Sequence, residues 1–146
     1  VWYHVFFKHL LWRIAMLRGW FLLALVACTP HPPSGPGLAH TAWRAAAFHQ
    51  GGTTLAVPPG EPLTLRFLDK EHVAGQADCN AFQGTYRQRG QHLSFHHLAG
   101  TKKGCGPSSH GARFLHALRG VTRFERHGGR LMLYAPDVRI EMEPMP

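Results

Sequence analysis

The sequence predicts a mainly β fold of the α+β class: a small antiparallel, partly barrel-like sheet with one amphipathic helix. Two observations support this prediction. After Trp43, short runs of alternating apolar and polar residues recur between turn residues, as they do in half-buried antiparallel strands. One segment, near residues 108–120, repeats its apolar residues at helical spacing instead. The chain has 146 residues, which is enough for one domain.

The expected strands follow one another at short intervals and are joined by turn residues. Leu63–Phe67 alternates apolar and polar residues, and an Asp-Lys-Glu turn at 69–71 separates it from a strand at 72–75. In the rest of the domain, turns are expected at Gly90, at Gly128-Gly129 and at Pro136. We expect the remaining strands at residues 82–87, 92–97, 121–126, Arg130–Tyr134 and 138–143.

One segment has the pattern of an amphipathic helix. Ser108 or Ser109 can cap its N-terminus, and Gly120 is placed to end it. Because its apolar residues fall on one face, the helix is expected to cover one end or face of the curled sheet. The apolar face holds Phe114, Leu115 and Leu118, and the other face holds Arg113, His116 and Arg119.

The first 27 residues have the three parts of a secretory signal peptide: a positive charge at Arg18, an apolar run over 20–27, and small residues before a cleavage point. Residues 25–28 read Leu-Val-Ala-Cys and resemble the lipobox of bacterial lipoproteins, whose cysteine thiol receives a diacylglyceryl group. We therefore expect a lipoprotein signal peptide at 1–27 and a stable lipid anchor on Cys28. Met16 begins a stretch that is itself a complete short signal, so residues 1–15 can lie upstream of the true start. A membrane-spanning helix is disfavoured, because it needs about 20 apolar residues and Arg13 and Arg18 interrupt the N-terminal segment.

A stretch rich in proline and glycine follows Cys28. Residues 28–41 hold few groups that a core could bury, so we expect a flexible tether there, ahead of one folded domain at residues 42–146. Thr29 stands where an aspartate would favour retention in the inner membrane of enteric-type bacteria. In a Gram-negative host we therefore expect the periplasmic face of the outer membrane.

The chain is basic, with a formal charge of +8. Three of these charges, Lys8, Arg13 and Arg18, lie in the expected signal peptide, which holds no acid, so its removal leaves +5. Apart from the pair at 102–103, the remaining cations are scattered, and neither a basic helix nor an RNA-binding pattern of aromatic and basic residues is present. We expect no nucleic-acid partner.

Cys79 and Cys105 remain as a pair once Cys28 carries lipid. An even number of cysteines in an exported domain favours a disulfide. Two free structural thiols, a metal site or a catalytic thiol remain as alternatives, because several histidines could supply a ligand or a base although no spacing requires it.

Other chemical motifs are weak. The chain has twelve histidines, but they lack the short paired spacing of a zinc site; His92 and His96, for example, would stand about 13 Å apart on a strand. The run from Gly106 to Gly111 misses the spacing of a nucleophile elbow, and there is no glycine-rich phosphate loop. We expect no metal, no cofactor and no enzymatic activity.

Several blocks of the sequence, taken in order, resemble one known family. Residues 79–86 read Cys-Asn-Ala-Phe-Gln-Gly-Thr-Tyr, and residues 98–105 read Leu-Ala-Gly-Thr-Lys-Lys-Gly-Cys. A Phe-Leu-x-Ala-Leu run at 114–118 and Leu-x-Leu at 131–133 follow. Together these blocks resemble the META domain family, which includes the HslJ-like bacterial lipoproteins, from about Trp43 to Met142. Asp78 departs from the family pattern, in which a small residue, often glycine, precedes the cysteine.

The resemblance implies a small antiparallel sheet with one helix, and a role in envelope or stress physiology without known catalysis. By fold analogy with pilotin lipoproteins, we expect a non-catalytic envelope lipoprotein that binds a protein segment or an apolar ligand in a groove. The alternative is an envelope inhibitor of a hydrolase that acts through the exposed loop from Gly104 to Gly111. The candidate groove residues, which could equally be filled core, are Phe67, Phe82, Tyr86, Leu93, Phe95, Phe114 and Leu118.

Overall fold

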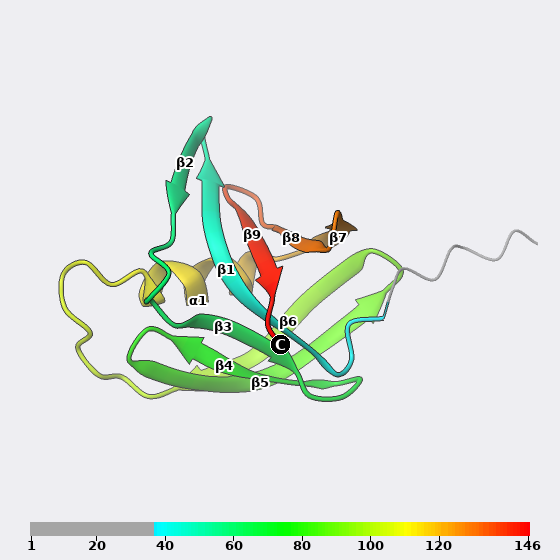
Figure 1. Cartoon of the computed structure of the whole chain (residues 1–146). Coiled ribbons are helices and arrows are strands. Elements are labelled where there is room, and N and C mark those ends of the chain that lie inside the picture. Colours follow the sequence, from blue (N-terminus) through cyan, green and yellow to red (C-terminus); the bar gives the residue numbers. More distant parts are fainter. Residues whose placement is uncertain (1–36) are drawn as a thin grey trace, which may run out of the picture. The chain divides into compact units, whose positions relative to one another are not determined.

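The computed structural model describes residues 37–146 (Figure 1). The expected signal peptide, the lipidation site Cys28 and residues 28–36 of the expected tether lie outside the described residues. Within residues 37–146, no helix is both long and apolar enough to cross a membrane.

Residues 37–146 form one mainly antiparallel β structure with a single helix, as the sequence predicts. Each strand pairs with its neighbours in the antiparallel direction. In chain order the elements are β1 (Thr41–Gln50), β2 (Thr53–Ala56), β3 (Leu63–Phe67), β4 (His72–Ala77), β5 (Asn80–Arg89), β6 (His92–Gly100), α1 (Gly111–Gly120), β7 (Arg123–His127), β8 (Arg130–Tyr134) and β9 (Arg139–Pro144).

The sheet closes into a ring because β1 has neighbours on both of its edges. Along one edge β1 pairs with β9, and along the other it pairs first with β3 and then with β2. The order β1-β3-β4-β5-β6-β7-β8-β9 therefore returns to β1, and β2 is an added edge strand. In Figure 1 the β1–β2 hairpin extends beyond the other strands.

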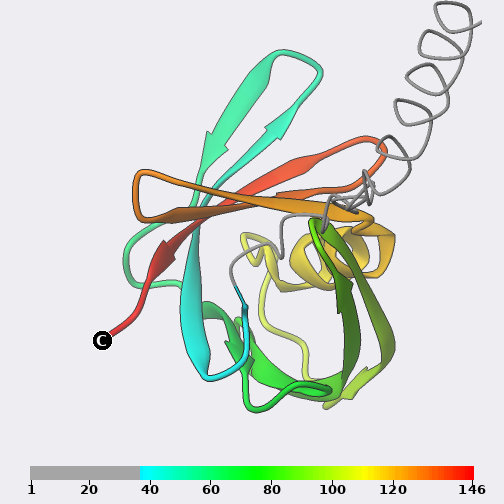
Figure 2. The same cartoon turned by 90° about the vertical axis from the view of Figure 1, so that its right-hand side faces the viewer.

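The ring is held most weakly between β6 and β7, which share the single register pair His92↔Arg123. Backbone hydrogen bonds from Leu93 N–H to Thr122 C=O (3.1 Å) and from Phe124 N–H to the carbonyl of residue 91 (2.9 Å) complete this seam. Helix α1 packs against β6 and β4, and Figure 2 shows it between the green strands and the orange hairpin. The helix therefore covers the core where strand pairing is short.

The helix lies where its pattern predicts, but its cap differs from the prediction. The N-cap residue is His110, not Ser108 or Ser109, and its side chain makes no capping hydrogen bond. Glu61 accepts hydrogen bonds from the N–H and the Nδ1 of His110, each at 2.6 Å. This carboxylate comes from the β2–β3 loop, so a residue far away in the sequence holds the start of the helix, where negative charge suits the helix dipole.

The start of the domain also differs from the prediction. Leu38 is fully buried and β1 begins at Thr41, so the folded domain starts ahead of residue 42 and takes residues from the expected tether. Four alanines give β1 a low intrinsic strand preference. Three pairing strands hold it in the sheet instead. Neither β1 nor β2 was expected from the sequence. The seven expected strands are all present, and β3 and β8 have the expected bounds.

Apolar side chains fill the interior of the ring. The buried apolar residues run from Leu38 to Met142, so residues 37–146 contain a core of their own. Phe67 meets Tyr86 edge to face, with ring centroids 4.8 Å apart. Phe114 of the helix packs edge to face against the rings of β1 and β5, at 6.5 and 6.2 Å. These contacts join the helix to both sides of the sheet.

Candidate functional site

The seven candidate groove residues lie in the core. Each is between 0% and 7% exposed. A ring of eight strands has an interior just wide enough for side chains to fill, so the apolar residues of neighbouring strands meet one another. The groove that the sequence suggested inside the sheet is occupied by packed side chains; these are Phe67, Phe82, Tyr86, Leu93, Phe95, Phe114 and Leu118.

A hollow of about 940 Å³ lies on the outer face of β3–β6 instead. Strand register arranges the outward-facing side chains there in two rows, each crossing four strands. Residues 59–62 of the β2–β3 loop form one wall. The first row holds Arg66, Ala74, Gln83 and Ala99, and the second holds Thr64, Gln76, Ala81 and Thr101.

The base of the hollow is made of small residues. Gly75 and Gly100 pair with Phe82 from either side. A Cβ on Gly75 would lie 2.7 Å from the Phe82 ring, and one on Gly100 would lie 3.0 Å from the Phe82 Cβ. Both glycines lie in the same inward-facing row as Leu65 and Phe82, so their missing side chains make room for the buried Phe82 ring, and only their backbone borders the hollow. Phe82 thus borders the hollow although it is only 4% exposed.

Three charged residues line the hollow, and two of them are paired. Arg44 donates to the Pro59 carbonyl at 2.9 Å and forms an ion pair with Glu143. Glu61 is paired with His110. The exposed side chain of Arg66 forms no hydrogen bond or ion pair with any residue in the described range 37–146. Arg66 therefore gives the hollow one uncompensated positive charge.

A disulfide joins Cys79 and Cys105, whose Cα atoms lie 5.5 Å apart. The cysteine pair predicts this bond, and the structure contains it. It links the β4–β5 turn to the loop between β6 and α1. In that turn Asp78 has a φ of +59°, a left-handed conformation that glycine adopts most easily. This conformation explains why a small residue is usual at that position in the family that the sequence resembles.

Asn80 fastens the same loop at a second point. Its Oδ1 accepts hydrogen bonds from the Lys103 N–H at 2.7 Å and from the Thr101 hydroxyl at 2.8 Å, and its Nδ2 donates to the Lys103 carbonyl at 3.0 Å. The carboxamide therefore pairs with Lys103 as a strand backbone would. At the far end of the loop, Glu61 holds His110. Gly104 and residues 106–108 of the segment from 104 to 111 are exposed, and the segment is anchored on both sides.

Gly84 has a packing role. The register of β5 and β6 shifts here, so that His97 and Leu98 together stand opposite Gly84. A Cβ on Gly84 would lie 2.7 Å from Leu98 Cδ2 and 2.9 Å from the His96 carbonyl oxygen. His97 occupies the bulge with a φ of +54°, a position where glycine is usual. The glycine of the 79–86 block is therefore structural.

Asp69 organises the β3–β4 turn. Its Oδ1 accepts the N–H groups of Glu71 and His72, each at 2.7 Å. These bonds, together with the His72 ring, lower the pKa of Asp69 to about 2. The Tyr86 hydroxyl donates to the Asp69 carbonyl at 2.7 Å, and burial, followed by the charge of Asp69, raises the pKa of Tyr86. The Asp69 carboxylate and the Tyr86 hydroxyl therefore already have hydrogen-bond partners that hold the turn.

Within the part of the chain that the structure describes, no three histidine, cysteine or acidic side chains come together as metal ligands would. The functional candidates that sequence reasoning missed are the residues of the hollow. Their signal in the sequence is that the outward positions of two strands hold one alanine and one glutamine each: Ala74 and Gln76 in β4, and Ala81 and Gln83 in β5. That pattern becomes informative only when the register places the two strands side by side.

These features define a class of protein: a small, disulfide-bonded β domain whose ring of strands and single helix enclose a filled core, with a hollow on its outer face. Residues 36–143 match the META domain family, and the chain belongs to that family. No curated protein matches the chain.

The fold is similar to that of solved structures. An NMR structure of a protein from Burkholderia xenovorans is 27% identical, with a TM-score of 0.63 over 74% of this chain and 83% of that one. A second NMR structure is 18% identical, with a TM-score of 0.59 over 73% and 90%. A duf4847 family protein from Bacteroides vulgatus is 14% identical, with a TM-score of 0.52 over 73% and 93%. The last two share the fold alone.

Proposed function

We propose that this protein is a non-catalytic envelope lipoprotein whose domain binds an extended segment of a partner protein in the hollow on the outer face of β3–β6. The observation that carries the proposal is the hollow itself, with a base of glycine and alanine and a border of hydroxyl, amide and guanidinium groups. A lipid on Cys28 would hold the domain at the periplasmic face of the outer membrane.

The dimensions of the hollow suit a polypeptide. Each row of side chains crosses four strands, which spans about 14 Å and corresponds to about four extended residues. The small base lets the backbone of a ligand approach closely. The amides of Gln76 and Gln83, which are exposed on neighbouring strands, can pair with peptide groups of the ligand.

The charge of the hollow specifies the segment further. Arg66 has no counter-ion within residues 37–146, and a guanidinium binds a carboxylate through two parallel hydrogen bonds. The segment should therefore carry a carboxylate, either on an acidic side chain or at its C-terminus.

Photo-crosslinking in cells tests this proposal. A benzophenone amino acid replaces Ala99, which lies in the hollow, or Ala112, which is exposed on the helix and serves as the matched control. We expect a discrete crosslinked protein from position 99 but none from position 112. A synthetic peptide spanning the crosslinked segment should then bind the purified protein.

A second variant probes the same site by blocking it. Ala81→Trp places an indole across the base of the hollow from an exposed position, so the fold should persist while the crosslink at 99 disappears. Equal crosslinking from 99 and 112, or a crosslink at 99 that survives Ala81→Trp in a folded protein, would contradict the proposal.

The alternative function, inhibition of an envelope hydrolase through the loop from Gly104 to Gly111, is favoured by one observation. The loop is exposed, yet the disulfide and Asn80 hold one side of it and Glu61 holds the other. Inhibitory loops bind best when little conformational freedom is lost. Under this alternative Ser108→Arg abolishes inhibition and Ala81→Trp does not.

A further inference from the structure

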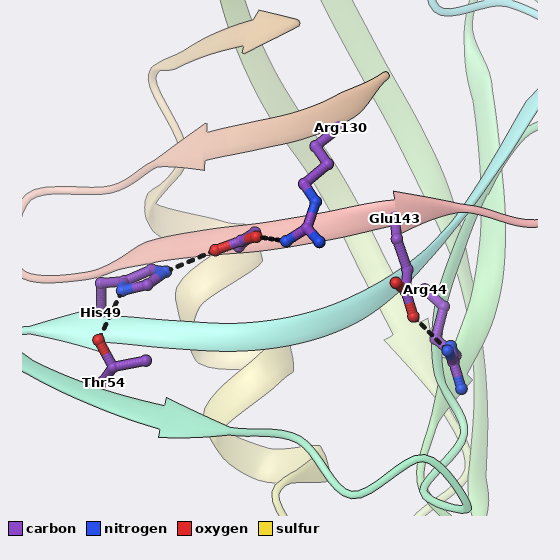
Figure 3. A network of polar contacts seen from close by, with 6 residues as sticks. Arg44, His49, Thr54, Arg130 and Glu143 are labelled. Carbon is purple, nitrogen blue, oxygen red and sulfur yellow. Dashed lines mark hydrogen bonds and ion pairs between the residues drawn. The ribbon is translucent and has the colours of Figure 1, made fainter. Parts of the chain in front are cut away.

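A second polar surface lies on the outer face of β2, β1, β9 and β8, away from the hollow proposed to bind a partner. Register places Thr54, His49, Arg139 and Tyr134 in one row across these four strands. Figure 3 shows part of this surface, where His49 contacts Thr54 on one side and a carboxylate of β9 on the other.

Two carboxylates on this surface and a third on the neighbouring strand β7 already have partners. Glu141 pairs with Arg130 and, at 3.0 Å, with the His49 ring, and Glu143 pairs with Arg44 (Figure 3). The third carboxylate, Glu125 of β7, pairs with the Arg123 guanidinium and accepts the Tyr134 hydroxyl at 2.7 Å.

Arg139 is left without a partner. Its side chain forms no hydrogen bond or ion pair with any residue in the described range, and its Nε is buried. Guanidinium groups that are partly removed from water normally gain a counter-ion or an acceptor, since an unpaired buried donor is costly. The position of Arg139 between His49 and Tyr134 gives it two neighbours that do not compensate its charge.

A hollow of about 440 Å³ opens beside Arg139. Its lining comes from the tip of the β1–β2 hairpin and from the facing side chains of β8 and β9. Gly51 and Gly52 form the turn, both with positive φ, and the space where their side chains would stand is open. The lining contains no carboxylate, so an anion entering the hollow would meet no like charge among its lining residues.

We propose that this hollow is a binding site for a small oxyanion, a phosphate or carboxylate group of a solute, held by the terminal amino groups of Arg139. Because the Nε is shielded, the anion approaches the guanidinium end-on, where both terminal nitrogens can donate to two of its oxygens. The Thr53 hydroxyl also lines the hollow and can donate to the same group.

The electrostatics of the neighbouring groups agree with this site. Burial, and then the positive charge of Arg139, lowers the pKa of His49. The pKa of Tyr134 is raised mainly by its bond to Glu125, and the charge of Arg139 acts in the opposite direction. A bound anion would neutralise Arg139 and so raise the pKa of His49. The Glu141 carboxylate also contacts the His49 ring, at 3.0 Å.

The test is an NMR titration of the full chain in an uncharged detergent with inorganic phosphate, with acetate as a second probe and sodium chloride at matched ionic strength as the control. We expect saturable shifts at residues 49–54, 134 and 139 with phosphate or acetate but not with chloride. The C–H resonances of His49, followed against pH, should report a higher pKa in the presence of the bound anion.

Variants distinguish anion binding at Arg139 from a general electrostatic effect of the added salt. Arg139→Gln should weaken binding by at least about tenfold, and Arg139→Lys, which keeps the charge but loses the fork, should weaken it as well. Arg87→Gln, which changes an exposed arginine of β5 that lines neither hollow, is the matched control and should leave the shifts at residues 49–54, 134 and 139 unchanged. Shifts that do not saturate, that appear equally with chloride, or that persist at full strength in Arg139→Gln would overturn the proposal. If Arg139→Gln does not fold, two other measurements test the proposal. Undiminished binding in Arg139→Lys, together with a His49 pKa that phosphate does not raise in the unaltered chain, would then overturn it.

Discussion

The disulfide between Cys79 and Cys105 allows a quantitative prediction. We consider the double variant Cys79→Ser/Cys105→Ser, in which neither replaced side chain is buried in the core, since Cys79 is exposed and Cys105 is half-buried. The Asn80 contacts with Lys103 remain available in the variant, so the folded loop should keep its position. The change therefore acts mainly on the unfolded chain.

The magnitude follows from the sequence separation of 26 between the two cysteines. In the chain-entropy account, a closed loop of that length stabilises the fold by about 3.5 kcal/mol at 25 °C. With an unfolding entropy of about 2.1 cal/mol/K per residue over about 110 ordered residues, the melting temperature should fall by roughly 15 °C.

Chemical and thermal unfolding of the oxidised protein and the double variant measure this difference. Mass spectrometry of the non-reduced protein first verifies that the bond is present, and the amide resonances of Asn80 and Lys103 report whether the loop is intact. A change below about 1 kcal/mol with an intact loop would refute the entropic reasoning. Loss of the Asn80 and Lys103 resonances would show instead that the bond holds the native loop in place.

Three further predictions follow from individual residues. Gly84→Ala should destabilise the domain by about 1–3 kcal/mol, because the added Cβ would press on Leu98 and on the His96 carbonyl oxygen. The control Gly104→Ala, whose Cβ would lie in open space, should change stability by less than about 0.5 kcal/mol. A denaturant titration measures both changes. Because the pKa of Asp69 is lower in the folded protein than its ordinary 3.8, its contribution to stability is present above that value and is lost as the pH falls through about 2. Asp69→Asn should remove this part of the acid dependence, and identical acid unfolding curves for the two proteins would contradict it. Cys28→Ala should leave the protein unlipidated in the soluble fraction; a variant that stays in the membrane fraction, cleaved at the same point, would disprove anchoring through Cys28.

Local patterns were sufficient for the elements whose burial alternates regularly. Leu63–Phe67 and Arg130–Tyr134 have the bounds expected from alternation, because each has one face on the core and the other in solvent. The helix was equally clear from the spacing of Phe114 and Leu118. Its cap was not, because the group that holds His110 is Glu61, a residue 49 positions away in the sequence.

The candidate groove shows the limit of such patterns. Alternation predicts that Phe67, Phe82 and Tyr86 face inward, and they do. It does not indicate whether the inside is open or filled, because that depends on how many strands close the ring and on where the helix packs.

The sequence alone determined the strand-rich class, the single helix and the resemblance to a family, and it favoured a bond between Cys79 and Cys105, because these depend on local periodicity, residue count and short motifs. The tertiary structure decided that β1 closes the ring despite its alanines, that the apolar residues form a filled core, and that two hollows lie on outer faces. The physical reason is that a surface site on a sheet is assembled across strands. Arg66 lies beside Ala74, and Arg139 beside His49 and Tyr134, only through the register of backbone hydrogen bonds.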